Sequence, residues 1–176
     1  MGKTSGDSLE HRLPDGSVAV IRPVCPEDKP LFVRATREFS PETMAKRFFA
    51  LKPSFSDAEL KYLTEVDGWD HFALVAVKKE ATGHWQGIGA ARFIRDRKDP
   101  ETAEFAVIVG DSWQKCGLGT AMLMFLIQAA KRRCVKRLKG DILAENVAAF
   151  HLIDRVAPKA QWLTNGVIAM VEFELH

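Results

Sequence analysis

The sequence predicts a single α/β (α+β) domain built on one mixed, mostly antiparallel sheet flanked by helices. Its 176 residues suit one domain with a core of its own. Three apolar stretches joined by short connections, at residues 72–77, 87–95 and 103–109, predict an antiparallel meander of strands. Helical and strand patterns then alternate, which places further helices against the same sheet.

Signals for turns and helix caps divide the rest of the chain into short elements. Ser40 before Pro41 is typical of an N-cap followed by proline at the first helical position, and Ser56 with Glu59 fits a capping box. Asn165-Gly166 is typical of a hairpin turn. The elements expected outside the meander are a strand at 17–22, helices at about 28–39, 41–49 and 56–66, a helix at about 117–133, a strand at 137–143, a helix at about 146–156, and closing strands within 162–175.

Composition bounds the class of protein. We interpret residues 1–12 as a flexible polar leader and residues 13–176 as the folded domain. Three cysteines without a signal peptide are typical of reduced thiols in the cytoplasm. The longest apolar runs are shorter than a membrane span, and no Cys or His spacing suggests a metal site. A net charge of +2 gives no reason to expect nucleic acid or an anionic membrane as a partner.

The stretch WQKCGLGTAM, residues 113–122, lies where an apolar strand is followed by an amphipathic helix. Gly117 and Gly119 permit a tight turn whose backbone amides face outward. The start of the helix adds unpaired N–H groups and the positive end of the helix dipole, and Lys115 adds a charge. The stretch therefore predicts a site for a phosphate or pyrophosphate, with a tight turn that binds nothing as the alternative. Its spacing fits neither the dinucleotide fingerprint nor a P-loop.

In this context the segment QKCGLGT, residues 114–120, resembles the acyl-CoA pyrophosphate loop of the GNAT N-acetyltransferase superfamily. The segment AEN, residues 144–146, looks like that family's second CoA-contacting segment, and the order of elements also matches over about residues 17–175. Within the superfamily, AEFAVIV before the loop and GDILAEN after it are most similar to the acetyltransferase domain of bacterial protein-lysine acetyltransferases. The resemblance implies a GNAT-like sheet and acetyl-CoA as co-substrate, with no metal.

The resemblance also implies which residues bind the cofactor. The backbone of Val107 and Val109 would pair with pantetheine while their side chains pack in the core, and the Val107 N–H would polarise the thioester carbonyl. Asn146 would contact pantetheine or cap its helix. The cofactor-binding residues implied in this way are Val107, Val109, Gln114, Lys115, Cys116, Gly117, Leu118, Gly119, Thr120, Asn146 and Phe150.

Glu104 is a carboxylate in the otherwise apolar strand AEFAVIV, and a buried carboxylate without a partner is costly. It can pair with a neighbouring cation such as Arg92, face water at an edge, or act in catalysis. The resemblance implies the role of general base, since a lysine ammonium must lose a proton before it attacks a thioester. The tyrosine that many family members use as the acid is missing, because the matching helix carries Phe150 and His151. Water or His151 would then protonate the thiolate.

The sequence thus predicts an N-acetyltransferase that transfers acetyl from acetyl-CoA to a primary amine by direct attack, with a protein lysine side chain as the first choice of acceptor. The alternatives are a small-amine (polyamine or aminoglycoside) acetyltransferase and a catalytically inactive CoA-binding regulatory module. The basic run at residues 131–133 is interpreted as a solvated helix end, so nucleic acid and membrane are not expected partners. The chain is expected to be a monomer or a homodimer.

Overall fold

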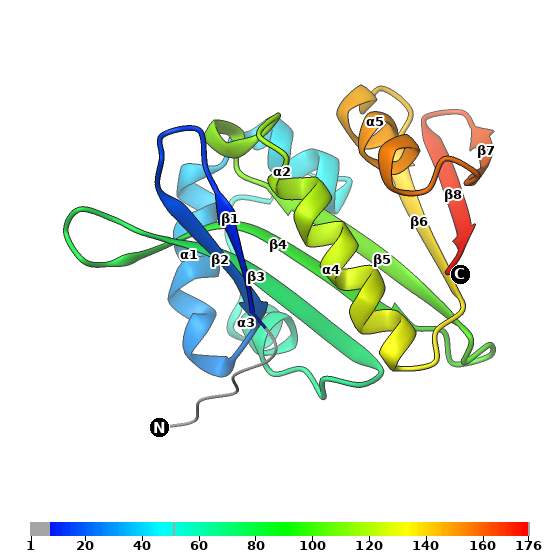
Figure 1. Ribbon diagram of the computed structural model, residues 1–176, viewed down its shortest axis with the longest axis horizontal. Coiled ribbons are helices and arrows are strands. Elements are labelled where there is room, and N and C mark those ends of the chain that lie inside the picture. Colours follow the sequence, from blue (N-terminus) through cyan, green and yellow to red (C-terminus); the bar gives the residue numbers. More distant parts are fainter. Residues whose placement is uncertain (1–7, 51, 176) are drawn as a thin grey trace.

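The computed structural model describes residues 8–50 and 52–175, and Figure 1 shows their arrangement. In this part of the chain the strands form one sheet in the order β1-β2-β3-β4-β5-β6-β8-β7. The strands are β1 Leu9–Arg12, β2 Val18–Pro23, β3 His71–Lys79, β4 Trp85–Arg95, β5 Thr102–Val109, β6 Arg137–Leu143, β7 Gln161–Asn165 and β8 Ile168–Glu174. All neighbours are antiparallel except β5 and β6, so the predicted mixed, mostly antiparallel sheet is confirmed.

The helices begin where the sequence signals indicate. Ser40 caps α2 by accepting a hydrogen bond from the Thr43 N–H, and Ser56 and Glu59 form the expected capping box of α3. Within the described residues no helix is long and apolar enough to cross a membrane. The helices are α1 Lys29–Glu38, α2 Pro41–Phe48, α3 Asp57–Thr64, α4 Leu118–Arg132 and α5 Val147–Val156, with short 3-10 turns at Pro26–Asp28 and Asp111–Trp113.

One strand was not expected. Residues 9–12, which the sequence analysis assigned to the flexible leader, form β1 and pair antiparallel with β2. Three of the four residues of β1 are exposed, because it is the edge strand of the sheet. Its stability therefore comes from the ladder with β2 and not from an apolar pattern that the sequence would reveal. The earlier part of the predicted leader, residues 1–7, lies outside the described residues.

The sheet has two faces, each covered by its own helices. Ala91 and Phe93 of β4 belong to the main core, to which α4 contributes Met122, Leu123 and Leu126. The alternate residues of β4 face α1–α3, where a smaller cluster includes Phe32 and Leu63. Figure 1 shows α4 crossing one face of the central strands, with α1 and α3 behind them.

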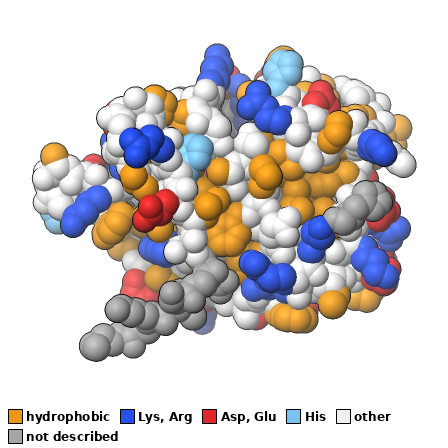
Figure 2. Space-filling view, viewed as in Figure 1, with side chains coloured by type: hydrophobic (Ala, Val, Ile, Leu, Met, Phe, Trp, Pro, Cys, Tyr) orange, Lys and Arg blue, Asp and Glu red, His pale blue; other side chains and the backbone are white. Residues whose placement is uncertain are grey.

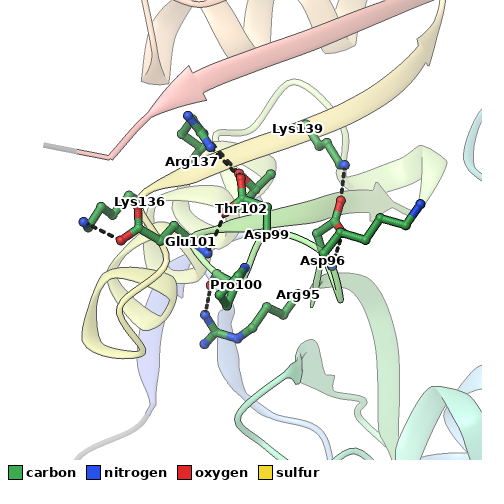
Figure 3. A network of polar contacts seen from close by, with 10 residues as sticks. Arg95, Asp96, Asp99, Pro100, Glu101, Thr102, Lys136, Arg137 and Lys139 are labelled. Atoms are coloured by element: carbon green, nitrogen blue, oxygen red, sulfur yellow. Dashed lines mark hydrogen bonds and ion pairs between the residues drawn. The ribbon is translucent and has the colours of Figure 1, made fainter.

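The two parallel strands β5 and β6 separate soon after they begin to pair. Their ladder joins Thr102–Glu104 only to Arg137–Lys139, and beyond it β6 pairs with β8 alone. The two strands diverge across the view of Figure 1 and leave a fork in the sheet. Hydrogen bonds and ion pairs hold the closed end, as Figure 3 shows: Arg137 bonds Asp99 and Thr102, at 2.5 and 3.0 Å, and Lys139 bonds Asp96 at 2.6 Å. Because exposed ion pairs contribute little energy individually, their main effect is to fix the register there.

Gly140 lies at the first position of β6 beyond the ladder, where the chains are closely packed. A Cβ at Gly140 would lie 3.0 Å from the Phe105 ring and 3.2 Å from the Phe105 carbonyl oxygen. The ring is itself packed edge-on against Phe173, with 5.5 Å between the ring centroids. The absence of a side chain at Gly140 therefore lets β5 and β6 meet closely before they separate.

We predict that Gly140→Ala lowers the free energy of unfolding by about 1–3 kcal/mol, since the added methyl overpacks a site with backbone on one side. Gly119→Ala is the matched control, because a Cβ there would meet Val109 and Leu152 at ordinary contact distances of 3.5 and 3.7 Å. Urea unfolding of the two variants measures the difference. Equal stability would show that the junction of β5 and β6 is not tightly packed.

Candidate functional site

Strand β5 directs backbone groups into the fork. The N–H of Gly110 donates to the Ile88 carbonyl and that of Asp96 donates to the Thr102 carbonyl, both at 2.9 Å, which fixes the hydrogen-bonding pairs between β4 and β5. Since hydrogen-bonded and non-hydrogen-bonded pairs alternate, Val107 and Val109 belong to the non-hydrogen-bonded set and point their backbone groups away from β4. Beyond Glu104, no strand in the described part of the chain pairs with this side of β5. The fork thus offers backbone donors and acceptors to a ligand.

The loop after β5 ends at an uncapped helix N-terminus. Gly117 is the N-cap of α4 with a φ of +83°, and no side chain caps the helix. Ala121 is the first residue whose N–H bonds back to Gly117, so the three preceding amides have no partner within the helix. Lys115 also adopts a left-handed φ, of +59°. The turn and the helix dipole together provide the geometry that the predicted anion site requires.

A cavity of about 480 Å³ joins the fork to this helix N-terminus, a volume in the range of small-molecule sites. Four cationic side chains line it, from α2, the loop and α5, and none of its lining residues is a carboxylate. A ligand with several negative charges therefore suits it. Its lining comprises Thr43, Lys46, Arg47, Val107, Ile108, Val109, Gln114, Lys115, Gly117, Gly119, Thr120, Asn146, Ala148, Ala149, His151, Leu152 and Arg155.

The structure brings most of the predicted cofactor residues to this cavity, but places the side chains of three elsewhere. The Cys116 thiol bonds the Trp113 carbonyl at 2.9 Å, and Leu118 is fully buried in the core. Phe150 stacks on Trp162 with 4.5 Å between the ring centroids. The cause is the helical period, because positions 148, 152 and 155 share the cavity face of α5 and position 150 lies opposite. Asn146 lines the cavity and also caps α5, as expected of its side chain.

The loop is tied to elements far away in the chain. Asp111 accepts hydrogen bonds from the Ser40 N–H, the Ser40 hydroxyl and the Thr43 hydroxyl, at 2.8, 2.5 and 2.8 Å. Burial acts to raise the pKa of Asp111, but these bonds hold it below its ordinary value. Gln114 donates to the Thr43 hydroxyl and to the Val109 carbonyl, both at 3.1 Å. These contacts fix α2, and with it the cations of α2, against the loop.

Glu104 occupies the last paired position of β5, at the point where the fork opens. Glu104 is exposed, and its carboxylate makes no hydrogen bond or ion pair within residues 8–50 and 52–175. The alternative of a pair with Arg92 is not realised, because Arg92 donates to His71 and to the Leu63 carbonyl. Lys139, its partner in the ladder, bonds Asp96. Glu104 is therefore an available carboxylate at the inner end of the fork.

Several residues around the cavity escaped the sequence analysis. His11 of β1 lies 3.1 Å from the Cys116 carbonyl oxygen, and since a carbonyl only accepts, its Nε2–H must donate to the loop. Lys46 and Arg47 come from α2, and Arg155 from α5. Their helices were predicted, but no local signal indicates which side of each helix faces the cavity.

A second groove, of about 470 Å³, lies between α4 and the C-terminal strands. Figure 2 shows apolar side chains gathered there, and Met124 and Ile127 of α4 are among its lining residues. It contains none of the predicted site residues. Among the described residues no group of three or more His, Cys, Asp or Glu side chains is placed to hold a metal ion.

The chain has clear relatives among known proteins. It is 34% identical over 156 residues to acetyltransferase Pat of Mycolicibacterium smegmatis, a match that covers 88% of this chain but only 45% of Pat. The GNAT domain of S. lividans PAT matches with a TM-score of 0.85 at 23% identity, over 99% of this chain and 100% of that domain, and shows the fold. A structure of yncA from Salmonella typhimurium with its cofactor acetyl-CoA matches with a TM-score of 0.67 at 16% identity, over 90% and 94%.

A family model matches residues 36–157 of this chain, a range that includes α2, the loop and all of α5. This range contains the fork, the uncapped start of α4 and Glu104. The chain therefore belongs to the acetyltransferase (GNAT) family.

Proposed function

We propose that this protein transfers the acetyl group of acetyl-CoA to a primary amine, with a protein lysine side chain as the acceptor and Glu104 as the general base. The observation that carries the proposal is the fork: it presents backbone groups of β5 beside an uncapped helix N-terminus, in a cavity lined by cations and no carboxylate. Acetyl-CoA has a matching shape, with an amide-containing pantetheine chain and a charged pyrophosphate. The Salmonella relative with acetyl-CoA supports this choice of cofactor.

The pyrophosphate would lie at the amides of Leu118, Gly119 and Thr120, where the helix dipole favours negative charge. The pantetheine amides would pair with the backbone of Val107 and Val109, as an added strand pairs with a sheet edge. This places the thioester toward the closed end of the fork. The Val107 N–H then donates to the carbonyl oxygen on which negative charge develops.

The acceptor amine would approach from the solvent side of Glu104. Its ammonium form loses a proton to the Glu104 carboxylate, and the nitrogen lone pair attacks the thioester carbon. The new C–N bond forms, the nitrogen gives its second proton to solvent, the C–S bond breaks, and CoA leaves as a thiolate. Since a thiol has an ordinary pKa of about 8.5, solvent can protonate this leaving group, and His151 lines the same cavity. The exposure of Glu104 supports an acceptor on the surface of another protein.

We predict that Glu104→Gln lowers kcat for acetyl transfer by about 10²–10⁴-fold and leaves the Kd for CoA near the wild-type value, because the amide cannot take the proton. Thiol release from acetyl-CoA with a lysine peptide measures kcat, and calorimetry measures Kd. Glu172→Gln is the matched control. Glu172 is an exposed carboxylate on β8, and Lys139 of β6 is the strand neighbour of Glu172 on one side and of Glu104 on the other. If the two variants turn over equally fast, Glu104 is not the base.

We predict that Gly119→Ala weakens CoA binding by about tenfold or more, since its methyl would lie where amides must meet the phosphates. The fold should tolerate the change, because the new Cβ makes only ordinary contacts with Val109 and Leu152. Calorimetric titration with CoA measures the effect. Ser112→Ala, beside the loop but outside the cavity lining, is the control. Unchanged affinity in Gly119→Ala would place the pyrophosphate elsewhere.

A further inference from the structure

A third cavity lies on the other face of the sheet, between α1, α2, β4 and β5. Its lining is apolar apart from two arginines, Arg47 and Arg92. It leaves about 40 Å³ for water-sized guests, which is room for about two to three small groups. Arg47 and Ile108 also line the cofactor cavity, so the two cavities adjoin at these residues.

Arg92 is a buried cation that contacts no acidic side chain within the described residues. It is only 4% exposed. Its guanidinium donates to His71 Nε2 at 3.1 Å and to the Leu63 carbonyl at 3.3 Å, and both acceptors are uncharged. The His71 ring must accept this bond, and burial together with the Arg92 charge lowers the pKa of His71 to about 4. Burial and the nearby Arg47 lower the pKa of Arg92 to about 10. A buried charge of this kind is costly unless an anion compensates it.

Arg47 is the second cation of this cavity, and it stands between the cavity and the cofactor site. Within the described residues its guanidinium makes no hydrogen bond or ion pair, and it lies 4.9 Å from the centre of the Phe48 ring. Burial lowers its pKa, and the charge of Glu104 acts in the opposite direction without direct contact. The lining of this cavity therefore carries two cations and no carboxylate.

We propose that Arg47 and Arg92 form a subsite for a carboxylate of the acceptor, so that the enzyme prefers an amine with an acidic group close by. This inference rests on the proposed acetyl transfer. Arg47 would bind the carboxylate directly, and Arg92 would add its charge from behind. A carboxylate is planar and small, so it fits both the paired N–H donors of a guanidinium and the volume of this cavity. The side chains of Arg92 and Glu104 lie on the same face of the sheet, at diagonal positions of the neighbouring strands β4 and β5, so the proposed subsite and the proposed base are close together.

The test compares lysine peptides that carry Glu or Gln beside the lysine, at saturating acetyl-CoA. The wild type should favour the Glu peptide by about tenfold or more in kcat/KM, because the Gln peptide lacks the carboxylate that makes a charged hydrogen bond with Arg47. Arg47→Gln should bring the ratio of the two close to one. Lys46→Gln is the matched control, since Lys46 lines only the cofactor cavity, and its ratio should stay at the wild-type value. A ratio of one in the wild type would overturn the subsite.

Two further experiments distinguish a failure of the subsite from a failure of the proposed acetyl transfer. Calorimetry with unreactive peptides, in which norleucine replaces the lysine, tests the subsite without catalysis. The wild type should bind the Glu form more tightly than the Gln form, whereas Arg47→Gln should bind both forms with the same weak affinity. If this holds while no amine is acetylated, the proposed function fails and the subsite stands. Succinyl-CoA tests the other source of a carboxylate. If the wild type and Lys46→Gln prefer succinyl-CoA to acetyl-CoA, and Arg47→Gln does not, the acyl chain and not the acceptor occupies the subsite.

Discussion

The separation of β5 from β6 is the constraint on which the rest of the site depends. A parallel pair that stayed together would satisfy every backbone group of β5, and the sheet would have no opening. Here the ladder stops at Glu104 and Lys139, and ion pairs with the preceding turn hold only its closed end. Exposed backbone donors and acceptors are a liability at a sheet edge. Inside a cavity they become a template for a ligand that can pair like a strand.

The other parts of the site are arranged around this opening. The loop after β5 delivers the start of α4, and α5 lies across the fork on the β6 side. Asp111 and Gln114 tie the loop to α2, which carries Lys46 and Arg47. These hydrogen bonds therefore fix the position of α2 relative to the loop.

Local signals predicted most of the fold. The caps at Ser40 and Ser56 and the turn at Asn165-Gly166 act over a few residues, so they can be read directly from the sequence. The edge strand β1 could not be predicted, because its pattern LEHR has no apolar alternation and its stability depends on β2. With β1 the contact of His11 to the loop was also missed. Arg47 was missed for a similar reason: its position depends on contacts between residues such as Ser40 and Asp111, 71 positions apart.

Amide hydrogen exchange, followed residue by residue with and without CoA, tests the central claim most directly, because it reports where the backbone becomes protected. The account predicts that CoA slows exchange at Val107, Val109 and the first amides of α4, and leaves β1 and β2 unchanged. Protection confined instead to the groove between α4 and the C-terminal strands would contradict it, since CoA would then bind outside the fork.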